Sequence, residues 1–432
     1  MSHEIPLARF GFNDCPMAVP QPFQIRVSEE ALSDLRSRLA HARWPDEALE
    51  NSDWAYGANT RYIRNLAQFW HDCDWRQQEA YLNGGLGCGA KHYKLRLPPG
   101  DEPGSGLEIH YVRATARAGP GIPLLLLHGW PGSWYEFHKL FKPLCDAGFD
   151  VIAPSLPGYG FSEAPRTRGF GPFSIARSMI LLMKTLGYTS FVAQGGDWGA
   201  MICRSLAQLS SVKPQYAACK AVHCNMVWAP QPPSEIMKEQ AKHFSEWDLK
   251  GMKGGKYYQQ WDSGYSKIQG TKPQTVGIAL NDSPAGLLAW IVEKLRQWSD
   301  CGGDPEKCFS KMDMITNVAM YWYGCAATSS ARLYYEGAFG GGEARVNKEY
   351  VELGNSKITI PAGFAMFPKE IFWPPKAVIE WAYPNMKRFQ IMPRGGHFAA
   401  WEQPELLSAE IVQFFLKDVD ARSLCVVPAS RI

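Results

Sequence analysis

The sequence predicts an α/β fold, in which helices cover both faces of a mostly parallel central sheet. Three observations support this. Short apolar strands alternate with amphipathic helices from residue 91 onward, the alternation stops over residues 228–354, and it resumes at residue 355. Strands that alternate with helices form parallel sheets, and a helical interruption indicates an inserted lid. We therefore expect four parts: an N-terminal meander (1–90), a first core part (91–227), a lid (228–354) and a second core part (355–432).

Each element of the first half follows from periodicity or from turn residues. Helices are expected at 29–40, where Ser28 is a good N-cap before two glutamates, and at 60–70. Residues 92–97 and 107–112 alternate as the strands of a hairpin, whereas 124–127 is uniformly apolar, as in a strand buried on both faces. The α/β pattern then continues with helices at 135–144, 175–186 and 200–209 and strands at 151–154, 191–194 and 217–224.

The second half has a helical insertion followed by the last strands. After the sixth predicted strand come helices at 234–244, 284–298 and 313–325; the second of these begins with Ser283 as N-cap and Pro284 at its first position. Strands at 358–366 and 387–391 and helices at 376–382 and 406–416 complete the prediction.

Composition limits the classes of function. The 432 residues are 46% hydrophobic, enough for a large core, and the net charge of +3 without a Lys/Arg block argues against nucleic acid. The eleven cysteines form no CxxC pair, so a zinc site is not expected. Residues 1–19 lack a long apolar stretch, which predicts neither a signal peptide nor a membrane anchor and hence a cytoplasmic enzyme. Ser430-Arg431-Ile432 resembles the peroxisomal S-K-L signal, which makes the peroxisome the alternative location.

The most informative motif is Gly195-Gly196-Asp197-Trp198-Gly199, between a predicted strand and a predicted helix. It matches the G-x-nucleophile-x-G turn of hydrolases, with Asp where Ser is usual. A carboxylate that attacks an acyl group would form a high-energy anhydride, whereas attack on an sp3 carbon forms an ester that water can cleave. Asp197 therefore predicts an epoxide or an alkyl halide as substrate.

Two further side chains complete a catalytic triad by their order in the chain. His397 follows the last predicted strand, where it could activate the water that cleaves the ester. Glu370 follows strand 358–366 and is the candidate to orient His397; another acid such as Glu380 is the alternative. The order nucleophile, acid, histidine is that of the α/β-hydrolase fold.

An oxyanion site is expected from two backbone N–H groups. One belongs to Trp198, directly after the nucleophile. The other belongs to Trp130 in the loop His128-Gly129-Trp130-Pro131-Gly132-Ser133, which follows strand 124–127.

Nearly the whole chain resembles the microsomal-type epoxide hydrolases in their soluble fungal form. The resemblance rests on Pro157-Gly158-Tyr159-Gly160-Phe161-Ser162, on the GGDWG and GGHFAAWE motifs at 195–199 and 395–402, and on N-terminal Arg43-Trp44-Pro45 and Asp74-Trp75-Arg76. It implies two lid tyrosines, Tyr265 and Tyr334, that donate hydrogen bonds to the epoxide oxygen. At the second of these sites, Arg332-Leu333-Tyr334-Tyr335-Glu336, the family's sequence pattern favours Tyr334 over Tyr335 as the donor. The sequence departs from part of that family in lacking an N-terminal anchor, and in having Glu370 where some relatives have Asp.

The resemblance implies an epoxide hydrolase that forms vicinal diols through an ester on Asp197, needs no metal or cofactor, and serves detoxification or aromatic hydrocarbon catabolism. Expected partners are water and a small apolar or aromatic epoxide, with a homodimer as an option. Tryptophans of the lid suggest a bulky substrate: Trp247, Trp261, Trp290 and Trp322. The alternatives are a haloalkane dehalogenase, a serine-type esterase, which the absence of an elbow serine disfavours, and a non-catalytic ligand receptor.

Overall fold

In the part of the chain that the structure describes, the central sheet has nine strands in the order β1-β2-β3-β5-β4-β6-β7-β8-β9. The computed structural model describes residues 19–46, 49, 53–337 and 348–425. From β5 to β9 all neighbouring strands are parallel, and only β1, β2 and β3 run antiparallel to their neighbours. The strands are β1 Gln21–Pro22, β2 Lys91–Arg96, β3 Glu108–Ala114, β4 Ile122–Leu127, β5 Phe149–Pro154, β6 Phe191–Gly195, β7 Cys219–Cys224, β8 Ala362–Met366 and β9 Met386–Ile391.

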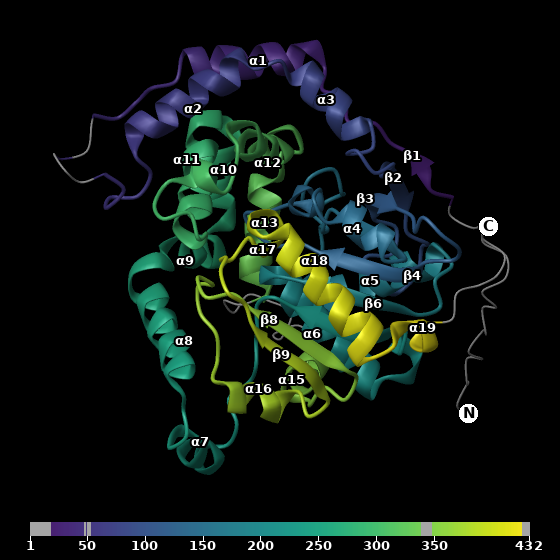
Figure 1. Cartoon of the computed structure of the whole chain (residues 1–432). Helices are drawn as coiled ribbons and strands as arrows, with labels where there is room; N and C mark the ends of the chain where they lie inside the picture. Colours follow the sequence, from purple (N-terminus) through teal and green to yellow (C-terminus); the bar gives the residue numbers. More distant parts are fainter. Residues whose placement is uncertain (1–18, 47–48, 50–52, 338–347, 426–432) are drawn as a thin grey trace, which may run out of the picture.

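Helices cover both faces of this sheet, as the sequence predicts. In Figure 1 the yellow helix α18 crosses in front of the strands, and α6 lies behind them. Helix α5 packs against α6, and α4 packs against α18. The core helices are α4 Phe141–Asp146, α5 Pro172–Thr185, α6 Asp197–Val212, α16 Lys376–Ala382, α17 Ala399–Glu402, α18 Pro404–Val412 and α19 Ala421–Leu424.

A helical lid occupies the interval between β7 and β8. Its described helices are α7 Ser234–Ala241, α8 Glu246–Tyr257, α9 Gly264–Thr271, α10 Pro273–Asp282, α11 Pro284–Trp298, α12 Lys311–Tyr323, α13 Ala326–Gly337 and α15 Lys348–Asn355, with a π-helical turn over Tyr258–Asp262. The lid thus follows the seventh strand and not the sixth, because the two-residue strand β1 carries no sequence signal of its own.

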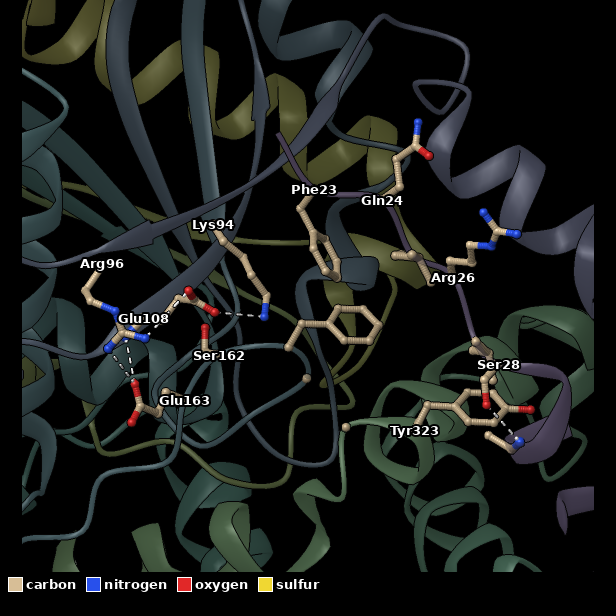
Figure 2. A pocket seen from close by; sticks show the side chains of 16 residues that line it. Phe23, Gln24, Arg26, Ser28, Lys94, Arg96, Glu108, Ser162, Glu163 and Tyr323 are labelled. Atoms are coloured by element: carbon tan, nitrogen blue, oxygen red, sulfur yellow. Dashed lines mark hydrogen bonds and ion pairs between the residues drawn. The ribbon is translucent and has the colours of Figure 1, made fainter. Parts of the chain in front are cut away.

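The N-terminal segment forms an arch over the lid. Helices α1 Glu29–Ala40, α2 Thr60–Asp72 and α3 Trp75–Asn83 run across α10, α11 and α12 in Figure 1. Figure 2 shows the groove where this segment meets the core: Phe23 lies beside Lys94, which pairs with Glu108 at 2.9 Å. The side chains of the triad candidates do not line this groove.

One expected helix is broken. Residues 135–144 form a short 3-10 helix, η1 Trp134–Phe137, and then α4. Pro143 explains the break, because proline lacks an N–H and clashes with the carbonyl four residues before it, so it is tolerated only in the first turn of a helix. The C-terminal helix expected at 406–416 likewise divides into α18 and a π-helical segment, Gln413–Asp418.

Two sequence-based expectations concern regions at the ends of the chain. Residues 1–18 and Ser430-Arg431-Ile432 lie outside the described residues, so the expected lack of an anchor and the peroxisomal signal stay predictions. Among the described helices no single one is long and apolar enough to cross a membrane. Helices α10 and α11 meet that test only as a pair, and they are bent by 114° at their junction.

Candidate active site

Asp197 lies at the turn between β6 and α6, in a backbone conformation that is rare outside glycine. Its φ is 50°, and α6 begins at this residue. Such a left-handed φ costs a non-glycine residue free energy, so the surrounding turn must hold it in place. A Cβ on Gly199 would lie 1.9 Å from the Leu127 carbonyl oxygen, and one on Gly195 would lie 2.5 Å from Gly199. Glycine at both positions is therefore what allows the turn.

Four loops meet at the carboxyl ends of the sheet strands, and they carry the predicted residues Trp130, Asp197, Glu370 and His397. Strand β4 pairs with β6 so that Leu127 lies opposite Gly195, which places the Trp130 loop beside the elbow. On the other side, Lys369 after β8 forms a bridge with Gly396 after β9. This bridge brings Glu370 next to His397.

A continuous chain of polar contacts joins these loops. The Trp130 N–H donates to Asp197 Oδ1 at 2.8 Å. His397 Nε2 lies 3.3 Å from Asp197 Oδ2, and His397 Nδ1 lies 2.6 Å from Glu370 Oε1. The Ile371 N–H also donates to that Glu370 oxygen, at 2.7 Å. Glu380, the alternative acid, instead pairs with Lys376 on an exposed surface.

The electrostatics of the triad favour a charged histidine in the free protein. Burial alone lowers the pKa of His397, but the carboxylates of Glu370 and Asp197 outweigh it and raise the pKa well above 6.5. The imidazolium can then donate from both ring nitrogens, one to each carboxylate.

The loop that carries His397 is held by an acid that the sequence did not single out. Glu402 accepts hydrogen bonds from the backbone N–H groups of Asp300, Gly396 and Phe398, at 2.7, 3.0 and 2.9 Å. Burial nevertheless raises the pKa of Glu402 to about 7. The backbone N–H of His397 donates to the carbonyl of Trp298 at the end of α11. This hydrogen bond attaches the loop to the lid as well.

A cavity of ≈ 720 Å³ opens in front of Asp197, between the core and the lid. Tyr265 and Tyr334 both line it, and both side chains are buried, whereas Tyr335 is 37% exposed. The two tyrosine rings meet edge to face with centroids 5.7 Å apart. Burial and the nearby Asp197 charge raise the pKa of both phenols well above 10, so both stay neutral donors.

The two tryptophans whose backbone N–H groups are predicted to form the oxyanion site also pack against the cavity tyrosines. Trp130 stacks on Tyr265 at 4.8 Å, and Trp198 meets Tyr334 edge to face at 5.0 Å. The Trp198 N–H lies in the first turn of α6, where backbone donors have no partner within the helix. Its part in an oxyanion site stays a prediction.

A third lid tyrosine belongs to this group and was missed from the sequence. The Tyr258 hydroxyl lies 2.9 Å from that of Tyr265, and both line the cavity. Tyr258 begins the π-helical turn, an element that often occurs at functional sites. Its separation from Tyr265 by seven residues, two helical turns, is the signal that could have found it.

The apolar wall of the cavity differs from the expected one. Among the described residues, none of the four tryptophans proposed from the sequence lines it. Trp247 stacks on Trp373, Trp290 donates to Gln269, Trp322 lies beneath Arg38, and Trp261 is 68% exposed. The wall comes instead from residues at the ends of the core strands and from α6: Trp198, Met201, Met226, Trp228, Ile371 and Phe372.

Comparison with known proteins agrees with this architecture. Residues 20–137 match the family model "Epoxide hydrolase N terminus", and residues 122–256 match "alpha/beta hydrolase fold". A putative epoxide hydrolase of Stigmatella aurantiaca is 38% identical, over 91% of this chain and 84% of that protein. Epoxide hydrolase 1 of Oryctolagus cuniculus is 36% identical, over 91% of this chain and 88% of the rabbit protein's length.

Two solved structures extend the likeness to three dimensions. The juvenile hormone epoxide hydrolase of the silkworm Bombyx mori superposes with a TM-score of 0.82 at 30% identity, covering 94% of this chain and 96% of that one. The epoxide hydrolase of Aspergillus niger superposes with a TM-score of 0.76 at 28% identity, covering 93% of this chain and 97% of that one. The chain belongs to the microsomal-type epoxide hydrolases of the α/β-hydrolase superfamily.

Proposed function

We propose that this epoxide hydrolase acts through a covalent ester on Asp197. The observation that carries the proposal is the contact chain from the Trp130 N–H through Asp197 and His397 to Glu370. Trp130 holds Asp197 Oδ1, which leaves Oδ2 as the attacking atom. A carboxylate that is already charged needs no base to attack an epoxide carbon.

In the first step Asp197 Oδ2 forms a bond to one epoxide carbon while the C–O bond of the ring breaks. The negative charge then develops on the epoxide oxygen. Tyr265 and Tyr334 donate hydrogen bonds to that oxygen, an interaction that strengthens as the charge grows and so lowers the barrier. Their neutral phenols suit this role, because a phenolate could not donate.

In the second step a water molecule attacks the Asp197 carbonyl carbon and transfers a proton to His397. Alkylation removes the negative charge of Asp197, which is one of the two carboxylates that raise the pKa of His397. The pKa of His397 therefore falls, its proton passes through solvent to the alkoxide formed in the first step, and the neutral ring can then act as a base. The tetrahedral oxyanion is held by the Trp130 and Trp198 N–H groups, and the diol leaves with the proton from His397.

The cavity supports an apolar epoxide as the substrate class. Its walls combine aromatic and thioether side chains with the three tyrosine hydroxyls, so a flat or bulky apolar group fits beside the reacting oxygen. Turnover of aromatic epoxides, with a role in detoxification or hydrocarbon catabolism, is part of this proposal.

Trapping the ester tests the mechanism. With styrene oxide as the probe, the His397→Gln variant should accumulate a protein adduct of intact epoxide mass on the peptide that contains Asp197, because hydrolysis has lost its base. Asp197→Asn should give neither adduct nor diol. Asp262→Asn is the matched control: Asp262 is a lid carboxylate that does not line this cavity, and its loss should leave turnover unchanged. Normal diol formation by the His397 variant would disprove the scheme.

A further inference from the structure

A second, much smaller cavity lies against Asp197. Its volume is ≈ 10 Å³, room for about one water molecule. His397 lines this cavity but not the 720 Å³ cavity, and among the described residues Asp197 alone lines both. A molecule in the small cavity can therefore contact Asp197 and His397 while an epoxide occupies the large one.

A carboxylic acid forms one wall of the small cavity. Glu136, in the 3-10 helix η1, lines it together with Gly132. A Cβ on Gly132 would lie 1.3 Å from Glu136 Oε1, so the carboxyl group lies directly over this glycine and depends on the missing side chain. The Tyr321 hydroxyl donates to the Gly132 carbonyl at 2.6 Å, which fixes the peptide beneath the acid.

An amide forms a further polar wall. Asn225, directly after β7, lines the cavity, and its Oδ1 accepts a hydrogen bond from Gln194 Nε2 at 2.9 Å. Its Nδ2 lies over Gly196, where a Cβ would come within 2.6 Å of it. A water needs two to four polar partners to occupy a site, and this cavity offers a histidine, a carboxyl group and an amide.

We propose that Glu136 is a positioning residue that, with His397, holds the water that cleaves the ester on Asp197. This inference rests on the proposed function. One O–H of the water points to His397 Nε2, which takes the proton as the oxygen bonds to the Asp197 carbonyl carbon. The other O–H donates to Glu136. The Cγ–Oδ2 bond of the ester then breaks, and Oδ2 leaves on the substrate carbon as a diol hydroxyl that takes the proton from His397. The water oxygen stays on Cγ, and its remaining proton passes to His397 as the carboxylate reforms.

The charge state of Glu136 agrees with this role. Burial raises its pKa to about 8, against a smaller opposing effect of His397, so a neutral acid predominates at neutral pH. A neutral carboxyl group can accept from the water without repelling the anionic tetrahedral intermediate. The Ser133 backbone N–H near the same carboxyl helps to keep it in place.

Separate measurement of the two chemical steps tests the inference. In single-turnover reactions with styrene oxide, quenched with acid and followed by mass spectrometry, Glu136→Leu should form the Asp197 ester at the wild-type rate. Its hydrolysis should be slower by about a hundredfold, the scale of a misplaced reactant. Glu136→Gln should recover most of the rate, because the amide oxygen accepts at the same place. A purely structural role would not separate the steps in this way.

Two further variants keep the outcome decisive. Glu136→Asp keeps the acid but withdraws it from the cavity, so it should also slow hydrolysis even if the leucine variant fails to fold. Asp313→Asn removes a carboxylate that binds the Tyr135 hydroxyl next to Glu136 without lining the cavity, and should hydrolyse the ester normally.

The result also separates this inference from the proposed function. Wild-type ester hydrolysis in both the leucine and the aspartate variants, with the ester still trapped in His397→Gln, would overturn the role of Glu136 alone. Absence of any ester in all variants would overturn the covalent mechanism and the inference with it.

Discussion

At the scale of single residues, the charge of His397 links the proposed catalysis to the stability of the fold. The ring is buried between two carboxylates that raise its pKa well above 6.5. A group whose pKa is higher in the folded than in the unfolded state stabilises the fold fully below the unfolded value, and this contribution is lost as the pH rises through the folded value. The His397 cation therefore stabilises the protein most below about pH 6.5.

Removal of one carboxylate should change this pH dependence. In Glu370→Gln the pKa of His397 should fall, so the variant should be less stable than wild type by an amount that is largest near pH 6 and shrinks toward alkaline pH. Melting temperatures measured across this range check the prediction. Glu380→Gln, on the exposed surface, is the control and should follow wild type throughout. A pH-independent difference for Glu370→Gln would contradict the linkage.

The sequence identifies residues whose role is tied to a strand end, and it misses those that depend on packing. Asp197, Glu370 and His397 follow β6, β8 and β9, and the order of these strands in the sheet brings them together without further information. Glu402 binds the backbone of Asp300, a contact between distant segments that only the folded chain brings together. Tyr258 contacts Tyr265 seven residues away, so its spacing was a signal that went unused. Nothing in the spacing of the four lid tryptophans shows which face of its helix each occupies against the core.

At the scale of elements, α13 shows how one helix distributes two neighbouring tyrosines. Tyr334 is 4% exposed and faces the cavity, whereas Tyr335 lies on the outer side. Successive residues on a helix point about 100° apart, so only one of two adjacent side chains can face the core. The helix itself packs against α10 and against α9, which carries Tyr265, Ser266 and Lys267 of the cavity wall.

This arrangement gives a matched pair of substitutions. Tyr334→Phe removes the proposed donor to the epoxide oxygen and should slow formation of the proposed ester by about a hundredfold, the usual effect of losing one donor to a developing oxyanion. Tyr335→Phe makes the same chemical change on the exposed side and should leave the rate unaltered. Rapid-quench measurement of ester formation compares the two, and equal rates for both variants would remove Tyr334 from the mechanism.

Regular core elements were predicted well, and the lid poorly. Helices α1, α11 and α16 have the predicted bounds, because a cap or a proline marks where each begins. Helices α8, α9, α10 and α13 were not predicted. Helix α8 contains three glycines, and two of them allow close approach to the Ile371–Trp373 segment, so packing stabilises a helix that its propensity disfavours.

At the scale of the whole molecule, the N-terminal arch clamps the lid from outside. Helix α2 packs against α11 and α12, and Trp75 of α3 contacts Tyr323 at the end of α12, with ring centroids 5.3 Å apart. On α1, Arg38 binds both the carbonyl and the carboxylate of Asp282 at 2.8 Å. The arch therefore supports α10, α11 and α12, and of these α10 and α12 pack against α13, the helix that carries Tyr334 of the cavity wall.

A substitution that destabilises the arch should also increase local opening of the lid helices. Leu66→Ala, at a position 1% exposed on α2, should lower the free energy of unfolding by about 2–5 kcal/mol through the cavity that it leaves. Hydrogen exchange should rise in α11 and α12 more than in β4 and β6. Gln68→Ala, on the exposed side of α2, should change stability by less than about 0.5 kcal/mol. Uniform exchange over lid and sheet would argue against a local clamp.

The last strand of the sheet has a consequence for how the protein behaves at high concentration. Among the described strands, β9 pairs with β8 alone, so its other edge offers unpaired backbone groups to any second strand. It carries Lys387 and Arg388, and Arg388 pairs with Glu410 and with Asp418 of the C-terminal helices. Charges of this kind along an open edge oppose strand-to-strand association. We therefore expect the protein to resist aggregation at the edge strand that precedes the loop of His397.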